Sequence, residues 1–448
     1  MNTIDERAKQ LKQSLVAFVL DAEGDLAIAL EAFTAEHLNR FSKSQSQSSA
    51  HTDLAVDCFL TQGRVGDKTP LDLFLEYHID LSQEDRTLLA QWNQSFTGLF
   101  AITQTLTDGF ELKNWLTEKR YFVRAVGLQP FEQIARLQPN EILITRLAPI
   151  TEAEWMFFSA FTLLGKLGKP KLAVAVGNFK KCYTEDLYGD APELLEEAWR
   201  SVEQSHHEWL DFFGSEEVTL PGYQANQQLQ LFQERVTQNR LAAAGIDSTQ
   251  SLSDLMKQHS ASEADSAEVT QGLETLEPLR KPSAETSAKS AMVPPQFSLP
   301  DALKKAEQVT LLTHPQWGQV YLSSYPQIKA LLELETVPTE KDKKVVRLAL
   351  NEPEMNAYLW HRLAQQYPIP LERLLQEVLE QPTFGLVEGL NPLLQSFGKP
   401  LKAVLPETAS VPVHLHSLFQ DAVMEVHKTQ TQKPKDASKA NNKGFQRR

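Results

Sequence analysis

The stretch LFAITQTLTDGFELKNWL, residues 99–116, decides the fold class of the N-terminal half of the chain. Its residues alternate with a period of two from Leu99 to Gln104, which is typical of a β-strand. Asp108 and Gly109 then supply a hairpin turn signal, and a second strand-like run begins at Phe110. The stretch therefore predicts an antiparallel hairpin.

Working outward from this hairpin, further strands are predicted at 121–126, 141–147 and 154–161. About five short strands between residues 96 and 165 predict a small barrel or a strongly twisted antiparallel sheet. The runs LFAI, ILITRL and WMFFSAF are apolar on both faces of their strands, so helices must cover part of the sheet.

Helices are predicted on both sides of the strands, which makes residues 1–232 an α+β domain. Residues 4–41 predict an antiparallel helix pair that is broken at Gly24. Two further helices are predicted before residue 92, one beginning at Thr69 and one at Ser82. An acidic amphipathic helix is predicted over 190–213, with Asp190 as its N-cap. Its apolar stripe consists of Leu195, Trp199, Val202, His206, Trp209 and Phe213.

The rest of the chain divides by composition. Residues 233–298 have no aromatic side chain before Phe297 and predict a disordered linker. Residues 299–427 show repeated helical patterns and predict a mainly helical domain. Residues 428–448 carry seven basic side chains against one acid, Asp436, and predict a basic disordered tail.

Net charge and cysteine usage limit the classes of partner and the cellular compartment that we expect for this protein. A formal charge of −14 and an isoelectric point near 5.4 disfavour contact with nucleic acid or anionic lipid, except through the basic tail. Cys58 and Cys182 are too few for a disulfide scaffold and predict buried free thiols in a reducing compartment. No signal peptide and no membrane-spanning run is recognised. These features predict a cytoplasmic protein.

Residues 57–124 combine four motifs: a TPLDLFLEYH helix, an SQEDRTLL helix, WNQSFTGLF entering a strand, and the LKNWLTEKRYFV hairpin. This stretch resembles a module of uncharacterised bacterial and cyanobacterial proteins, some of which carry a cysteine-rich SEC-C zinc-binding end. The cysteine-rich end is missing here, so the resemblance implies no zinc site. The resemblance implies a cyanobacterial or related bacterial source, and with it a role in housekeeping or in photosynthetic-complex assembly. It implies no particular reaction.

The sequence shows no recognisable catalytic motif. The chain has no P-loop, GxGxxG, GxSxG, HExxH or CxxC pattern. Gly165, Gly168 and Lys169 are spaced wrongly for a phosphate loop and predict a turn. His78 follows the end of a predicted helix, where a histidine is expected to cap the helix rather than to catalyse. No cofactor is predicted.

Two weak metal candidates remain in the sequence. Glu203, His207 and Asp211 share one face of the predicted helix over 190–213, although a solvated acidic face explains the same spacing. His414 and His416 would point to one side of a strand, but no further ligand stands near them. His206, in the chain's single ExxH motif, lies on the apolar stripe and is expected to be a packed core histidine.

Eleven acids against one base, Arg200, lie between residues 185 and 217, and this surface would steer a basic partner. The leading prediction is therefore a non-catalytic protein-interaction or complex-assembly factor of unknown partner. An RNA- or ribosome-associated protein working through the tail is the first alternative. An enzyme whose site is assembled from distant residues is the second. The interaction residues predicted on these grounds are Glu193, Glu196, Glu197, Glu203, Lys433, Lys435, Arg447 and Arg448.

Overall fold

The computed structural model describes residues 3–40, 49–125, 134, 136–243, 292–293, 299–334 and 338–431. The fold is α+β, as predicted, and the chain divides into two compact units. The first unit comprises Met1–Ala198 and Val411–Arg448, and the second comprises Trp199–Ser410. The sequence-based boundaries at 232 and 299 group the segments differently, because they follow chain order and cannot register contacts between distant segments.

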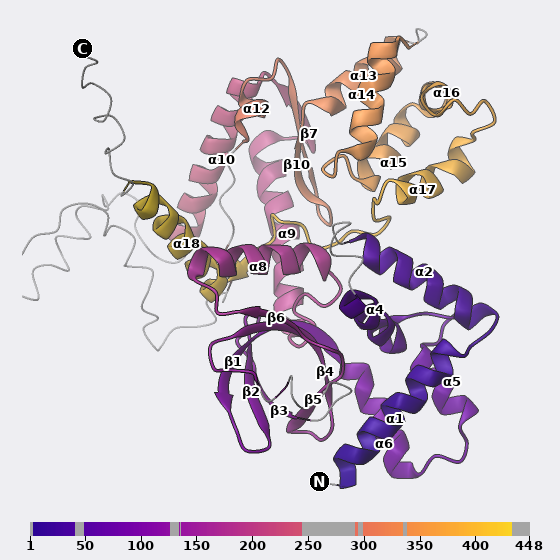
Figure 1. The fold of residues 1–448 in the computed structure, drawn as a ribbon. Helices are drawn as coiled ribbons and strands as arrows, with labels where there is room; N and C mark the ends of the chain where they lie inside the picture. Colours follow the sequence, from indigo (N-terminus) through magenta and orange to yellow (C-terminus); the bar gives the residue numbers. More distant parts are fainter. Residues whose placement is uncertain are drawn as a thin grey trace, which may run out of the picture. The chain divides into compact units, whose positions relative to one another are not determined.

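The first unit contains helices, a sheet and its C-terminal helix (Figure 1). Its helices are α1 (Thr3–Leu20), α2 (Asp25–Asn39), α4 (Ser49–Gln62), α5 (Pro70–Tyr77), α6 (Gln83–Gln91), η1 (Trp92–Gln94), α8 (Lys169–Cys182) and α18 (Val413–Thr431). Its strands are β1 (Phe96–Thr105), β2 (Gly109–Asn114), β3 (Arg120–Arg124), β4 (Ile142–Pro149), β5 (Glu154–Phe157), β6 (Thr162–Gly165) and the short β11 (Val411–Pro412).

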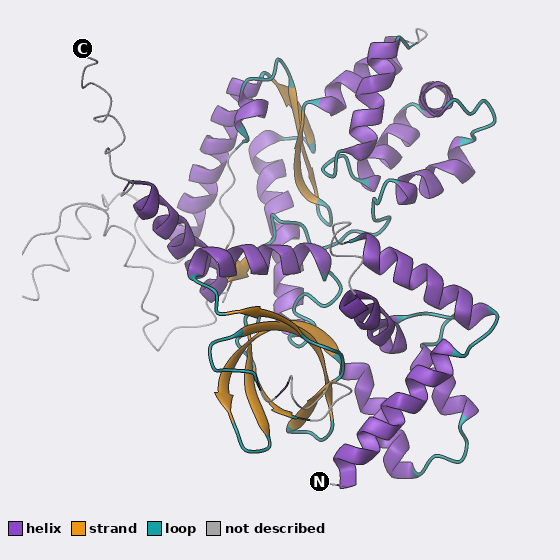
Figure 2. Cartoon of the chain, viewed as in Figure 1, coloured by secondary structure: helices purple, strands orange, loops and turns teal. Residues whose placement is uncertain are grey.

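Five strands of the first unit close into a barrel, as predicted (Figure 2). The order is β1-β2-β3-β5-β4, and β4 pairs again with β1, so the sheet has no open edge between these strands. Within the ring, β3 and β5 pair in parallel, whereas the other pairs are antiparallel. The strand predicted at 154–161 is shorter than expected, because β5 ends at Phe157. The strand β6, which was not predicted, pairs with β4 outside the ring.

The hairpin predicted at Asp108 and Gly109 joins β1 and β2, with Thr105 opposite Phe110. Leu106 N–H donates to the Gly109 carbonyl at 2.8 Å and closes the turn. A Cβ atom at Gly109 would lie 2.1 Å from the Val123 carbonyl oxygen of β3. Glycine is required here because β3 approaches too closely for any side chain.

Two apolar cores hold the first unit together. Inside the barrel, Phe100, Leu112, Val123, Leu143 and Phe157 belong to one buried cluster. The second cluster joins helices α1, α4, α5 and α6 to the outward residues of β4 and β5. The helices thus cover one side of the barrel, as the doubly apolar strands predicted.

The second unit begins within α9 (Pro192–Phe213), which crosses the division between the units. Its other elements are β7 (Glu217–Leu220), α10 (Gly222–Ala243), β8 (Met292–Val293), α12 (Asp301–Lys304), β9 (Val309–His314), β10 (Gly318–Leu322), α13 (Ser324–Leu334), α14 (Glu340–Asn351), α15 (Ala357–Gln366), α16 (Pro368–Leu379) and α17 (Leu386–Ser396). The helical C-terminal part is as predicted, but the sheet β10-β9-β7 beside it was not expected.

The observed elements differ in detail from three local predictions, which concern the start of α9, the linker and the apolar stripe of α9. Helix α9 begins at Pro192, and Ala191 rather than Asp190 accepts its first backbone bonds. Helix α10 continues to Ala243, so the first part of the expected linker is helical, and most of the remainder of 233–298 lies outside the described residues. Trp209 of α9 is fully buried, whereas Trp199 is only half-buried.

Candidate functional site

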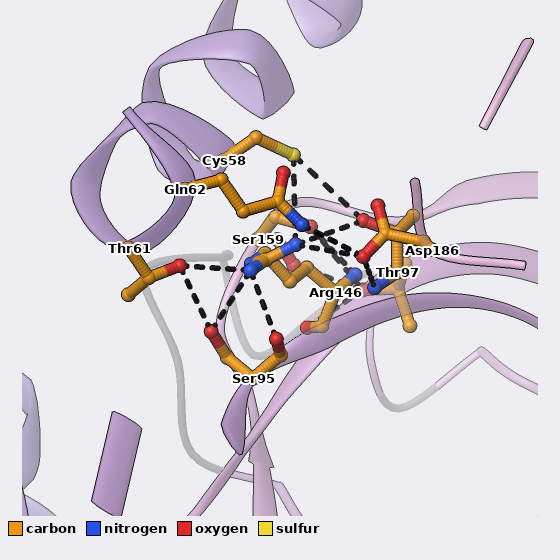
Figure 3. Close-up of polar contacts among 9 residues, drawn as sticks. Cys58, Thr61, Gln62, Ser95, Thr97, Arg146, Ser159 and Asp186 are labelled. Atoms are coloured by element: carbon orange, nitrogen blue, oxygen red, sulfur yellow. Dashed lines mark hydrogen bonds and ion pairs between the residues drawn. The ribbon is translucent and has the colours of Figure 1, made fainter. Parts of the chain in front are cut away.

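A buried arginine lies on the outer face of the barrel, beneath helix α4 (Figure 3). Arg146 of β4 is completely enclosed. Its Nη2 donates to Thr61 Oγ1 at 2.8 Å, to the Ser95 carbonyl at 2.9 Å and to Ser95 Oγ at 3.0 Å. Its Nη1 donates to Thr97 Oγ1 at 3.2 Å. One guanidinium therefore joins α4 to β1 and to the turn before it.

Asp186, in the segment after α8, supplies the counter-charge. Its Oδ1 lies 3.3 Å from Arg146 Nη1 and accepts from Gln62 Nε2 at 2.9 Å and from Thr97 N–H at 3.1 Å. The Asp186 side chain is only 6% exposed. A buried ion pair of this kind persists only where further hydrogen bonds satisfy both ions. The arrangement binds four segments of the first unit together.

Cys58 lies against the same guanidinium, with Sγ 3.8 Å from Arg146 Nη1 and 3.7 Å from Thr97 Oγ1. Burial raises the pKa of the Cys58 thiol to about 12, although Arg146 acts in the opposite direction. A neutral, enclosed thiol is a poor nucleophile. Both cysteines are free, and Cys58 is buried as predicted. This network, which we call the Arg146 network, is sealed and suited to holding the fold rather than to chemistry.

The metal candidates do not assemble into a site. Glu203, His207 and Asp211 lie exposed along α9. His414 and His416 belong to helix α18 and not to a strand, so two residues of separation cannot place both rings on one side. Within the described ranges, no group of three or more His, Cys, Asp or Glu side chains is arranged to hold a metal ion.

His414 instead has a partner in the barrel. Its Nε2 lies 2.8 Å from the Trp115 carbonyl, and its Nδ1 lies 3.6 Å from Glu118 Oε2. Helix α18 also packs along α8 (Figure 1). His206 is buried and bonded to Thr313 Oγ1 at 3.2 Å, as its place on the apolar stripe predicted.

The predicted interaction residues of α9 are partly engaged within the chain. Glu193 pairs with Lys119 of the β2–β3 turn at 3.1 Å. A hydrogen bond from its own backbone N–H, and after it the Lys119 ammonium, lowers the pKa of the Glu193 carboxyl. Glu196 and Glu197 also have interactions with other residues. Glu203 is exposed. Lys433, Lys435, Arg447 and Arg448 lie outside the described residues.

The outer face of β2 and β3 has basic side chains whose charges are balanced by carboxylates. Arg120 pairs with Glu111 at 3.1 Å, and Lys113 pairs with Glu118 at 2.6 Å. Arg124 pairs with Glu154 at 2.7 Å and also with an aspartate of α1 at 3.2 Å. A phosphate backbone is bound by basic side chains that displace its counterions. The basic side chains named here therefore already have carboxylate partners.

An accessible feature lies at the corner between α5 and α6. Tyr77 is 72% exposed and Ile79 is 85% exposed, and both follow Leu75, which is half-buried. Leu75 also lines an open groove of about 560 Å³ along α6. The other lining residues are Gln83, Arg86, Thr87, Ala90, Gln91 and Gln94. We call Tyr77, Ile79 and this groove the α5–α6 corner.

Side-chain hydrogen bonds to the backbone fix the conformation of the α5–α6 corner. Arg86 donates to the Leu75 carbonyl at 3.1 Å and to the His78 carbonyl at 2.9 Å. The His78 ring stacks on Phe74 at 4.1 Å, and His78 forms the C-cap of α5, as predicted. The exposed side chains therefore project from a backbone that is fixed on both sides.

The start of α6 is anchored in the same way. Ser82 Oγ accepts from Asp85 N–H at 3.1 Å and caps the helix. The Asp85 carboxylate receives two bonds from the guanidinium of Arg7 in α1, at 2.6 and 2.7 Å. These bonds lower the pKa of Asp85 to about 2. Both helices of the corner are predicted from the sequence, whereas no local pattern predicts the exposure of Tyr77 and Ile79.

Comparisons of the chain with protein-family models, with curated proteins and with solved structures found no match. No helix among the described segments is long and apolar enough to cross a membrane.

Proposed function

We propose that this protein is a non-catalytic interaction factor that binds a protein partner through the α5–α6 corner. The observation that carries the proposal is the exposure of Tyr77 and Ile79 on a backbone pinned by Arg86. Aromatic and aliphatic side chains that lose water on binding supply much of the affinity of protein interfaces. A fixed backbone lowers the entropy that such an interface loses.

The charges around the corner favour a particular kind of partner. Asp80 and Glu84 are exposed on either side of the turn, and the whole chain carries −14. A negative surface accelerates encounter with a positive one. The occupant we propose is a partner segment that presents an apolar side chain flanked by Lys or Arg. The glutamines of the groove supply donors and acceptors for its backbone.

Two observations favour this function over the alternatives. The Arg146 network is enclosed, so it offers no entry to a substrate. The basic side chains on the β2–β3 face are already paired with carboxylates. The tail remains the alternative route to RNA.

The test places a photo-crosslinking amino acid at position 79 of the full chain, and the crosslinked protein is identified from native lysate and then purified. Binding of this purified partner is measured for wild type, Ile79→Asp and Tyr77→Ala. We expect affinity to fall at least tenfold in Ile79→Asp, with unfolding free energy changed by no more than about 0.5 kcal/mol because the site is at the surface.

The matched control is Val387→Asp, since Val387 is 95% exposed but belongs to α17 of the second unit. Its affinity for the same partner should equal that of wild type. Equal binding by Ile79→Asp and wild type would show that the α5–α6 corner is not the docking surface.

A further inference from the structure

Lys399, in the second unit, is a lysine that folding has buried. Helix α17 ends at Ser396, and Gly398 follows with a left-handed φ of 69°. Lys399 N–H then donates to the Leu394 carbonyl at 2.9 Å, which turns the chain back over the helix end. As a result the Lys399 side chain is directed inward, and the residue is only 5% exposed.

The Lys399 amine has a carbonyl partner. Its Nζ donates to the Glu352 carbonyl at 2.7 Å, at the C-cap of α14. This bond is a helix-terminal contact with a structural role. A carbonyl accepts from a neutral amine as well as from an ammonium, so the bond does not require the charge. Burial lowers the pKa of Lys399 to about 8, against the opposing effect of the Glu352 and Glu354 carboxylates.

The structural role does not explain a second feature, a small pocket beside this lysine. Lys399 lines a pocket of about 150 Å³ together with Asn351, Asn356 and Phe397. A water molecule occupies roughly 30 Å³ in the liquid, so the pocket admits a molecule of a few heavy atoms. A small electrophile in the pocket would lie beside Lys399, because this residue forms part of the pocket wall.

We propose that Lys399 is a site of reversible carbamate formation with carbon dioxide. The lone pair of the neutral Nζ attacks the carbon of CO₂, a nitrogen–carbon bond forms, and one C=O π pair moves onto oxygen. Nζ then loses one proton to solvent, which leaves R–NH–COO⁻ and H⁺. No oxidant, reductant or other co-reactant is needed, and one N–H remains on Nζ for the Glu352 carbonyl.

One side of the pocket suits the anionic product, although the Glu352 and Glu354 carboxylates act against it. Asn356 lines it and is the N-cap of α15, with Oδ1 accepting from Leu359 N–H at 3.2 Å. The N-terminus of a helix carries partial positive charge that favours an anion. CO₂ fits the size of the pocket, whereas an acyl donor on a carrier would be too large. The inference is independent of partner binding at the α5–α6 corner.

The experiment incubates the folded full chain with ¹³C-labelled bicarbonate and CO₂ at about pH 8, and alkylates any carbamate with triethyloxonium before digestion. Lys402 is the internal control, because it is exposed and only three residues away. We expect trapped carbamate at Lys399 to exceed that at Lys402 at least tenfold. Equal trapping at the two lysines of the folded protein would overturn the proposal.

Three further measurements separate carbamate formation from a purely structural lysine. Lys399→Arg retains a donor for the Glu352 carbonyl but has no amine that reacts with CO₂, so its ¹³C carbamate resonance should be absent while its fold is retained. At fixed pH, CO₂ should raise the thermal midpoint of wild type and not that of Lys399→Arg. If Lys399 reacts with formaldehyde in the folded protein yet never forms a carbamate, the proposal is also overturned.

Discussion

Arg146 Nη1 lies 3.3 Å from Asp186 Oδ1, although the two residues are 40 positions apart and belong to a barrel strand and to the segment after α8. Both side chains are buried, so each ion depends on the other for compensation. Removal of this ion pair should show how much of the stability of the first unit depends on the Arg146 network.

Asp186→Ala should lower the free energy of unfolding by about 3–5 kcal/mol, because it leaves the Arg146 charge buried without its counter-ion. The neighbouring Glu185→Ala is the control, since Glu185 is half-exposed and pairs with Arg40 at the surface at 3.1 Å. Its cost should be about 0–1 kcal/mol. Denaturant titrations measure both variants, and comparable small losses would argue against a structural role for the network.

Trp209→Ala should cost about 3–5 kcal/mol, because the side chain is fully buried between Phe213 and Phe232 and donates to the Ser215 carbonyl at 3.0 Å. Trp199→Ala, ten residues earlier on the same helix, should cost less because Trp199 is only half-buried. Equilibrium unfolding followed by circular dichroism ranks the two. The reverse order would mean that the apolar stripe of α9 is packed differently.

His37 should make the first unit less stable in mild acid. Burial, followed by the nearby charge of Arg40, lowers the pKa of His37 to about 4, with Asp186 opposing. The native state therefore binds fewer protons than the unfolded state, whose histidine titrates near 6.5. The stabilisation that comes from keeping His37 neutral is complete above about pH 6.5. It is lost as pH falls toward 4, and the free energy of unfolding decreases by about 3 kcal/mol in all.

The measurement compares the unfolding free energy of wild type and His37→Gln between pH 7.5 and 4. The difference between the two proteins should change in favour of the variant as pH falls. A difference that stays constant over this range would contradict the assignment, whatever its size.

Deletion of residues 428–448 separates partner binding from RNA binding. The tail's seven basic residues and one aspartate contribute +6, so the remaining 427 residues carry −20. RNA or ribosome association through the tail should fall steeply with salt and disappear on deletion. We expect binding of the protein partner to survive deletion. Loss of every partner on deletion would instead favour the RNA-associated alternative.

Local sequence patterns were sufficient for most elements of the first unit. Residues 96–116 form a hairpin because alternation and the turn at Asp108 and Gly109 act over neighbouring positions. The same holds for α5 and α6, whose N-caps Thr69 and Ser82 were recognisable beside their helices. The segment around His414 forms an α-helix and not the strand that was considered for it. A short apolar run fits both a strand and a helix, so its pattern alone cannot decide between them.

The sequence by itself determined the fold class, the barrel strands, the capped helices and the helical C-terminal part, because periodicity and capping are properties of neighbouring residues. The tertiary structure alone decided the parallel pairing of β3 with β5, the counter-ion of Arg146, the exposure of Ile79 and the burial of Lys399. An arginine within the apolar run ILITRL was the one local signal of the network. What covers a side chain, and which charge faces it, depends on segments that only folding brings together.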